Sequence, residues 1–338
     1  MNVLSLFDGM SCGQIALERA GLHVDVYFAS EIDKHAIKVT QKNYPNTIQL
    51  GDVQNVDGTQ LPKIDLLLGG SPCSGFSFAG KQLNFNDPRS RLFFDFVRIL
   101  KEAQPKYFLF ENVRMKKEYE SIITKELGVD PIIINSALVS AQNRVRLYWT
   151  NIKNITQPAD KGIVLADIIE NGLVDRDKSF CIDSNYFKGG NLKQYFNKSR
   201  RHLVFKENPQ TIALLDHIGG HKQPKIVSGS LRGRHIINGK RADGKGKTKQ
   251  RIELRADKKT NCLSTVQKDT IVCYPVDNKK YYSPQEILWR KLTPLECERL
   301  QTLPDNYSEG ISSTQRYKMI GNGWTVDVIT HILNSLIM

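Results

Sequence analysis

The sequence predicts an α/β fold, in which a doubly wound, Rossmann-like sheet carries helices on both faces and a smaller, mostly β domain is inserted. Three observations predict this fold. Short apolar runs that end in glycine or in an acidic residue alternate with helical patterns, which is the order found in a parallel sheet. Residues 176–287 interrupt that alternation with short strand-like runs, glycine-bearing turns and little helical periodicity. The α/β pattern returns from residue 288. We therefore expect one domain from residues 1–175 plus 288–338, and a second from residues 176–287.

The chain opens with a strand, a glycine-bearing turn and a helix. Residues 2–7 have a strand pattern, residues 8–13 (DGMSCG) form the turn, and residues 14–20 have a helical pattern. Such a unit is typical of nucleotide-binding folds, because backbone N–H groups and a helix N-terminus meet the ligand there. The turn lacks the G-x-G-x-x-G pattern, so a dinucleotide is not favoured.

Acidic residues follow the next two strand patterns. The run 24–30 ends at Glu31, and a third element closes at Asp52. An acidic residue after the second strand is placed to accept hydrogen bonds from ribose hydroxyls. Asp33 is placed to cap the helix that begins beside it. We expect Glu31 to bind a ligand and Asp33 to cap.

The most informative stretch is GGSPCSGF, residues 69–76, which follows the apolar run 64–68. This pattern predicts a buried strand that ends in a loop. Pro72 fixes its own φ and pushes Ser71 into an extended conformation, so the backbone sets the direction of Cys73. A thiol at the carboxyl end of a central strand lies where open α/β sheets carry their chemistry. Most single cysteines are buried core residues, so this stretch alone leaves a nucleophile and a core residue equally open.

A carboxylate follows the next strand pattern, because Glu111 comes directly after the apolar residues 107–110. We expect Glu111 at the same sheet edge as Cys73. Such surroundings can raise the pKa of a carboxyl enough for it to act as an acid.

The segment QNRVR, residues 142–146, alternates polar and apolar side chains. In an extended segment this alternation puts Gln142, Arg144 and Arg146 on one face. If the strand is central, these side chains need an anionic partner or a base edge. If the strand is at the surface, they are simply exposed.

The positive charge is concentrated in one segment. The chain of 338 residues has a formal net charge of +13. Residues 176–287 hold 24 Lys and Arg against 10 Asp and Glu, a net +14, and the rest holds 24 against 25, a net −1. A localised excess of this kind indicates a face that binds a polyanion, and nucleic acid is the favoured partner.

The six cysteines are scattered and form no C-x-x-C pair, so neither a zinc site nor a disulfide framework is indicated and no metal is expected. No apolar run approaches the roughly 20 residues of a membrane span, and no signal peptide is apparent. We expect a cytoplasmic protein with no membrane partner.

Together these motifs resemble those of the DNA (cytosine-5) methyltransferase family, over nearly the full length and in the family's order. The matching segments are FDGMSCG (7–13), EID (31–33), GDV (51–53), GGSPCSGFS (69–77), ENV (111–113), QNRVR (142–146), LTPLECERLQ (292–301) and GNGWTV (321–326). The catalytic half is similar to the vertebrate de novo enzymes, and residues 176–287 resemble a bacterial or phage target recognition domain. Two segments depart from the family pattern. Ser11-Cys12 stands where the cofactor turn usually has a second glycine pair, and CLST (262–265) where the recognition domain usually has Thr-Leu-Thr.

The resemblance implies a role for each reacting residue. Cys73 is the nucleophile that adds to carbon 6 of cytosine, Glu111 the proton donor at ring nitrogen 3, and Arg146 the contact to the 2-carbonyl oxygen. Arg144, with Gln142, holds the phosphate and the catalytic loop. The implied cofactor is S-adenosyl-L-methionine, and the residues implied to bind it are Phe7, Gly9, Met10, Glu31, Ile32, Asp52, Val53, Pro72, Leu92, Asn322 and Trp324.

The resemblance further implies that the larger domain is catalytic and that residues 176–287 recognise a specific site in double-stranded DNA. The target cytosine must then be flipped into the pocket, under a loop of residues 74–91 that closes over it. The chain is expected to act as a monomer on DNA, in a bacterial cell or a phage-infected host. A cognate restriction endonuclease acting on the same site is a further expected partner. Two alternatives stay open: a tRNA cytosine-5 methyltransferase on the same scaffold, and a catalytically inactive DNA-binding relative.

Overall fold

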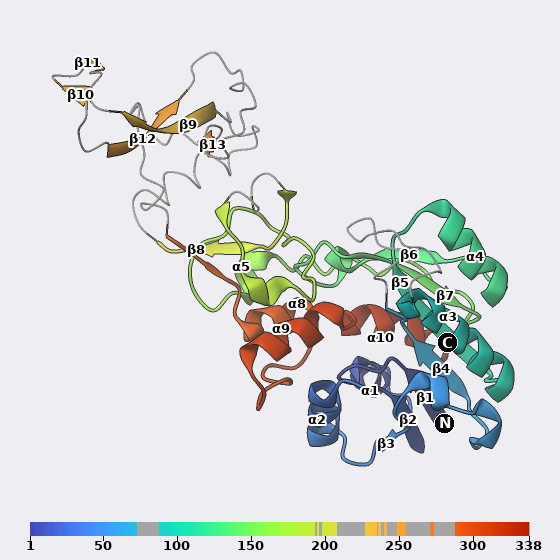
Figure 1. Cartoon of the computed structure of the whole chain (residues 1–338). Helices are drawn as coiled ribbons and strands as arrows, with labels where there is room; N and C mark the ends of the chain where they lie inside the picture. The colour runs from blue at the N-terminus through green and yellow to red at the C-terminus, as the bar shows by residue number, and fades with distance from the viewer. Residues whose placement is uncertain are drawn as a thin grey trace. The chain divides into compact units, whose positions relative to one another are not determined.

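The structure, a computed structural model, describes residues 1–72, 88–192, 195, 198–207, 227–234, 236–237, 240–241, 249–254, 271–273 and 288–337 (Figure 1). The chain forms two compact units. Unit 1 comprises Met1–Ile168, Lys178–Gly189 and Thr293–Met338, and unit 2 comprises Ile169–Asp177 and Gly190–Leu292.

Unit 1 is built on a seven-stranded sheet with the order β3-β2-β1-β4-β5-β7-β6. Its strands are β1 (Asn2–Leu6), β2 (Val26–Ser30), β3 (Ile48–Gln49), β4 (Leu66–Gly69), β5 (Tyr107–Val113), β6 (Ile132–Asn135) and β7 (Val145–Thr150). The pairs from β3 to β5 are parallel, and β7 runs antiparallel to both β5 and β6. The strand order reverses between β1 and β4, which is where doubly wound sheets bind their ligands. The predicted fold class is confirmed.

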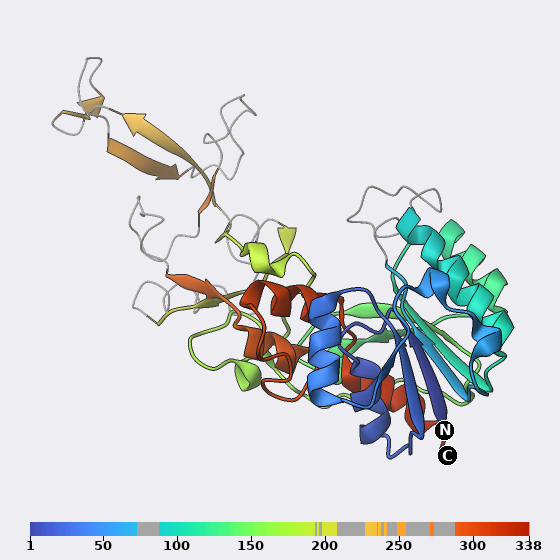
Figure 2. The ribbon, with the colours of Figure 1, turned by 60° about the horizontal axis from the view of Figure 1, so that its bottom comes forward.

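The helices of unit 1 cover both faces of this sheet. They are α1 (Cys12–Arg19), α2 (Lys34–Asn43), α3 (Pro88–Ala103), α4 (Lys117–Leu127), α5 (Leu165–Ile168), α8 (Pro294–Leu300), α9 (Ser313–Asn322) and α10 (Val326–Asn334), with 3-10 turns η1 (Val53–Asn55), η2 (Gly58–Gln60), η4 (Ser136–Leu138) and η5 (Tyr186–Lys188). In Figure 2 the teal α3 and α4 lie on one side of the sheet, and the blue α1 and α2 with the red α10 lie on the other. Helix α10 packs against α1, so the last helix of the chain completes the layer begun by the first.

The core beside β4 is aromatic. Phe93 and Phe96 of α3 are fully buried against Phe110 of β5, which stacks in turn on Trp149 of β7. The last residue of β4, Gly69, lets α3 approach closely, since a Cβ there would lie 2.7 Å from the Phe96 ring.

Strand β5 is longer than the sequence predicts. We expected Glu111 to follow the strand, but β5 continues to Val113. The extension arises because β7 pairs antiparallel along its end, with Glu111 opposite Tyr148 and Val113 opposite Arg146. The backbone of Glu111 is therefore held in a sheet ladder rather than in a loop.

The described elements of unit 2 are mostly strands. They are β8 (Leu203–Phe205) paired with β14 (Trp289–Lys291), a three-stranded sheet β12-β9-β13 of β9 (Val227–Arg234), β12 (Lys249–Leu254) and β13 (Ile271–Cys273), and the pair β10 (Ile236–Ile237) with β11 (Lys240–Arg241). Within this unit Asp175 is paired with Arg176 and accepts a hydrogen bond from the Tyr195 hydroxyl.

The boundary between the units differs from the expected residue 176. Residues 178–189 belong to unit 1, because their side chains and backbone are tied to its framework. The Lys178 ammonium donates to the carbonyls of Ala137, Ser140 and Ile163 at 2.8, 3.1 and 2.6 Å.

Candidate active site

The turn after β1 is held in an unusual conformation. Phe7, Gly9 and Ser11 all have positive φ, near 60°. The Gly9 N–H donates to Glu31 Oε2 at 2.8 Å, and Glu31 Oε1 accepts from the N–H groups of Ile32 and Asp33, both at 2.8 Å. Glu31 therefore ties the ends of β1 and β2 together. Asp33 caps α2 as predicted, accepting from the His35 N–H at 2.9 Å.

A polar network lies beneath this turn. The hydroxyls of Ser11 and Tyr27 donate to the Asp8 carboxylate, the latter at 2.7 Å, and Thr40 donates to the Ser11 hydroxyl at 3.1 Å. Burial, reinforced by the nearby charge of Glu31, raises the pKa of Asp8 to about 6, although the three hydroxyls of Ser5, Ser11 and Tyr27 oppose that rise. Ser11 lies in the left-handed region, with φ 60° and ψ 43°, which favours glycine. Its bonds to Asp8 and Thr40 hold that conformation.

The other residues expected to bind the cofactor come from several elements and differ in exposure. Asp52 caps η1 by accepting from the Gln54 N–H at 3.0 Å, and Ile32 is 73% exposed. Asn322 is exposed, and Phe7, Pro72, Leu92 and Trp324 are half-buried. Met10 and Val53 are buried, at 1% and 5% exposure.

Gly70, Glu111 and Trp324 converge at the carboxyl end of β4. A Cβ at Gly70 would lie 3.1 Å from both Glu111 Oε2 and Trp324 Nε1. Trp324 also faces the start of α1, since a Cβ at Gly13 would lie 3.7 Å from its ring. The loop after β4, the Glu111 carboxylate and the segment after α9 therefore meet at one place.

Asn112 connects this place to the loop that carries Cys73. Its Nδ2 donates to the carbonyl and the hydroxyl of Ser71, at 3.3 and 3.4 Å, and its Oδ1 accepts from the Val113 N–H at 2.8 Å. Ser71 and Asn112 are both buried. Cys73 itself, and most of the 74–91 loop, lie outside the described residues.

Glu111 and Arg146 form an ion pair across β5 and β7. Arg146 Nε lies 3.0 Å from Glu111 Oε1, and the two side chains are only 13% and 12% exposed. A partly buried pair of this kind keeps its geometry, because little water competes for either group. Sequence alternation correctly placed Arg144 and Arg146 on one face, since both guanidiniums contact Cys181.

The side chains of Arg144 and Gln142 bind main-chain groups, and their expected contact with the phosphate stays a prediction. Arg144 is 3% exposed and donates to the carbonyls of Ile182 at 3.1 Å, Gly321 at 3.4 Å and Gly323 at 2.8 Å. Gln142 is fully buried and accepts from the Ile182 N–H at 2.9 Å. The reason is that residues 178–189 return over this face, which the alternation of QNRVR could not reveal.

Three contributors to the site were not singled out from the sequence. Asn112 had a usable signal, because it follows Glu111 in the ENV motif. Asp8 is part of the DGMSCG turn, but that pattern gave no sign of its hydrogen bonds with Ser11 and Tyr27. Cys181 had no signal, since its arginine partners lie some 35 residues away in the chain.

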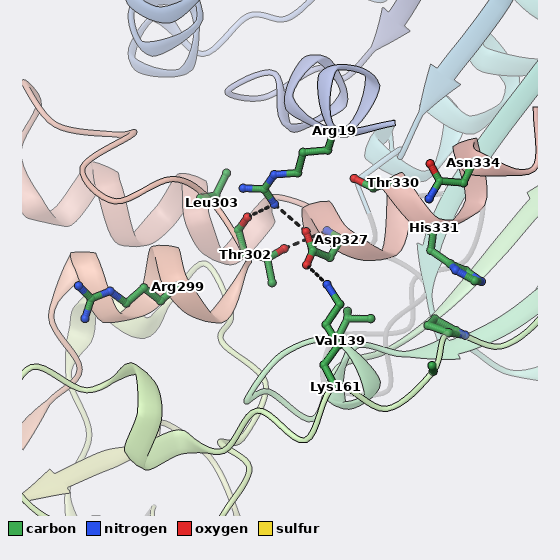
Figure 3. Close-up of a pocket in the computed structure, with 12 residues that line it drawn as sticks. Arg19, Val139, Lys161, Arg299, Thr302, Leu303, Asp327, Thr330, His331 and Asn334 are labelled. Carbon is green, nitrogen blue, oxygen red and sulfur yellow. Dashed lines mark hydrogen bonds and ion pairs between the residues drawn. The ribbon is translucent and has the colours of Figure 1, made fainter. Parts of the chain in front are cut away.

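A cavity lies in unit 1 between α1, α8, α10 and the 158–161 segment. Figure 3 shows it centred on Asp327, which pairs with Arg19 and Lys161, both at 2.6 Å. It has a volume of about 770 Å³, and no candidate catalytic or cofactor residue lines it. Among the described residues, no cluster of three or more His, Cys, Asp or Glu could hold a metal ion. In that same part of the chain, no helix combines the length and apolar character needed to cross a bilayer.

Known proteins resemble this chain along its whole length. The family model described as C-5 cytosine-specific DNA methylase matches residues 1–338. The orphan methyltransferase M.SPRI of Bacillus phage SPR is 28% identical, with 100% of this chain and 97% of the phage protein covered. The type II methyltransferase M.Eco47II of Escherichia coli is 30% identical, with 99% and 80% covered. A mutant of DNMT2 from Spodoptera frugiperda has the same fold, with a TM-score of 0.59 at 19% identity and 100% and 99% covered.

The fold is that of an α/β protein with a doubly wound sheet, whose strand order reverses between β1 and β4. The chain belongs to the C-5 cytosine-specific DNA methylase family. The reaction of that family is methyl transfer to carbon 5 of cytosine in DNA.

Proposed function

We propose that the chain is a DNA (cytosine-5-)-methyltransferase that uses S-adenosyl-L-methionine to methylate a cytosine within a specific duplex site. The observation that carries this proposal is the Glu111–Arg146 ion pair beside Gly70 and Trp324. This pair supports a role for Glu111 as a proton donor and for Arg146 as a cation, and it adjoins Gly70, which precedes the Ser71-Pro72-Cys73 stretch.

The residues at the β1–β2 edge fit the cofactor. The Glu31 carboxylate accepts three main-chain N–H bonds, and a carboxylate has about four lone-pair sites, so one acceptor site is left for a ribose hydroxyl. Ile32, at 73% exposure, offers an apolar surface beside it. S-adenosylmethionine, when bound, supplies the methyl group. The chain's part is to hold it through Gly9, Glu31 and Asp52 and through Asn322 and Trp324.

The reacting residues act on the base. Carbon 5 of cytosine is a poor nucleophile, so the Cys73 thiolate adds to carbon 6 and pushes electron density to carbon 5. Glu111 donates a proton to ring nitrogen 3, and Arg146 donates to the 2-carbonyl oxygen. None of these groups can reach a stacked base, so the cytosine is flipped out of the duplex.

Residues 176–287 are proposed to recognise the DNA site, since they hold the whole basic excess of the chain. The chain is proposed to act as a monomer on DNA, because each chain has one such segment for one catalytic unit. A cognate endonuclease would cut the same site when it is unmethylated.

Bisulfite sequencing of DNA from cells that express the protein tests the proposal first, and it yields the methylated site. Duplex DNA with that site and 5-fluorocytosine at the target should then form a covalent adduct with the wild type, because fluorine is not eliminated from carbon 5. Cys73→Ser should form no adduct and transfer no methyl group, while still binding S-adenosylmethionine. Cys297→Ala, at a buried cysteine of α8, is the matched control and should behave as wild type.

Methylation of tRNA but not of DNA, assayed side by side, would favour the alternative RNA substrate. Absence of methylation on both, with intact DNA binding, would favour an inactive relative. Full activity of Cys73→Ser would refute the mechanism.

A further inference from the structure

Cys181 lies between the two arginines of the QNRVR motif. Its sulfur is 3.4 Å from Arg144 Nη1 and 3.8 Å from Arg146 Nη2, both within hydrogen-bonding range for sulfur. The thiol can also donate to the Ile182 carbonyl, at 3.6 Å.

The Arg146 guanidinium is oriented from three directions. Its Nε is paired with Glu111 at 3.0 Å, its Nη1 donates to the Val145 carbonyl at 2.9 Å, and its Nη2 donates to Cys181. An arginine has five N–H donors in one plane. Three directions fix that plane, and the remaining N–H on each terminal nitrogen stays available to a base.

Cys181 is itself held firmly. Arg144 binds the Ile182 carbonyl and the carbonyls of Gly321 and Gly323, and Gln142 accepts from the Ile182 N–H. The close approach at Gly321 excludes even a methyl group, since a Cβ there would lie 2.6 Å from the Ser184 nitrogen. The main-chain contacts of residues 182–184 with unit 1 therefore fix the position of the sulfur.

The charges around the sulfur strengthen these bonds. Burial alone would raise the pKa of the Cys181 thiol, but the guanidiniums of Arg144 and Arg146 outweigh burial and hold the pKa below its usual value. A sulfur with thiolate character is a stronger acceptor for both arginines.

We propose that Cys181 is a positioning residue, which holds the guanidinium of Arg146 in the plane that pairs with Glu111 and faces the target base. The inference rests on the proposed function, because Arg146 matters only if a base is bound there. It explains why residues 178–189 belong to the catalytic unit and not to unit 2.

The test compares Cys181→Ala, which removes the acceptor, with Cys181→Ser, which keeps one. In single-turnover methylation of duplex DNA, Cys181→Ala should slow methyl transfer roughly 10- to 100-fold, the effect of misplacing a positioning group. Cys181→Ser should restore most of the rate. Affinity for S-adenosylmethionine, measured by calorimetry, should stay within about twofold of wild type for both variants. Cys297→Ala controls for loss of a thiol elsewhere.

A double-mutant cycle separates positioning from general destabilisation. If Cys181 acts through Arg146, adding Cys181→Ala to an Arg146→Lys protein should lower the rate of methyl transfer by less than about threefold. If Cys181 is purely structural, Cys181→Ala should lower the rate by the same factor in the wild type and in Arg146→Lys, and that result would overturn the inference.

A measurement on the native sulfur covers the case in which Cys181→Ala does not fold. The thiolate absorbance of the wild type minus that of Cys181→Ser should rise at a pH below the usual range for a thiol, and a rise only above that range would contradict the inference. If the wild type methylates no DNA, the proposed function fails. If it methylates and Cys181→Ala has the wild-type rate, only the present inference fails.

Discussion

The substitution Gly321→Ala should loosen the packing of residues 178–189 against the rest of unit 1. Gly321 lies in α9, and a Cβ there would lie well inside van der Waals contact distance of the Asp183 carbonyl and 2.6 Å from the Ser184 nitrogen. These atoms are backbone, so no flexible side chain can move aside, and the segment itself must shift.

The magnitude follows from two opposing effects. Alanine is favoured over glycine in a helix interior by about 1 kcal/mol. Overpacking a tight contact costs about 1–3 kcal/mol. The expected net effect is a loss of up to ~2 kcal/mol, together with displacement of the Ile182 and Gly321 carbonyls that Arg144 holds.

Two assays check this expectation. Urea unfolding should show a lower midpoint for Gly321→Ala, with an unchanged slope. Peptide mass spectrometry of the native protein after brief alkylation should show faster modification of Cys181, because its segment opens locally. Lys318→Ala, an exposed site on the same helix, controls for helix propensity and should change neither measurement by much. A Gly321→Ala protein as stable as wild type, with Cys181 equally protected, would refute the reasoning.

Three further predictions follow from the site, its buried acid and the basic segment. Glu111→Gln should lower turnover ~100- to 10,000-fold with cofactor affinity unchanged. The exposed Glu309→Gln is the control. If Glu111→Gln instead turns over normally but binds the cofactor weakly, Glu111 is a cofactor ligand. Because burial raises the pKa of Asp8 from 3.8 to about 6, the folded state retains a proton that the unfolded chain releases. The stability of the wild type relative to Asp8→Asn should therefore fall as pH rises from about 4 to 6, by at most about 3 kcal/mol, and parallel profiles would contradict this. DNA affinity should fall with salt at a log–log slope of about −0.9 per phosphate contact. Replacing lysines of the 245–249 run, most of which lies outside the described residues, should flatten that slope. Arg232→Ala in β9 should instead relax the choice of site and weaken binding to the preferred sequence by roughly 1–3 kcal/mol, and the equivalent change at Arg234 should do the same. Grafting residues 176–287 from a relative of different specificity should transfer the preferred site, and methylation at the original site would place recognition elsewhere.

The sequence revealed the sheet edge but not the packing above it. Apolar runs and the residues that end them identified Glu31, Asp52 and Glu111 along one edge, because strand ends are local features. The partners of Arg144 could not be predicted, since alternation shows which side chains share a face and not which distant segment covers it. The same holds for Cys181, which meets the QNRVR arginines only after the chain returns some 35 residues later. The length of β5 was underestimated because its last residues pair with an antiparallel neighbour, which is a tertiary effect.

The packing of α10 on α1 has a consequence for synthesis of the chain. Arg19 and Asp327, which join these helices, are 308 residues apart, so at a ribosomal rate of 5–20 residues per second about 15–60 s separate their appearance. During that interval the apolar face of α1 has no covering helix, and the segment for unit 2 is made in between. Trp324, which approaches Gly13 at the start of α1, is also made only at the end of synthesis. Folding of this catalytic unit is therefore governed by its final residues, which favours a nascent chain protected by a chaperone until release.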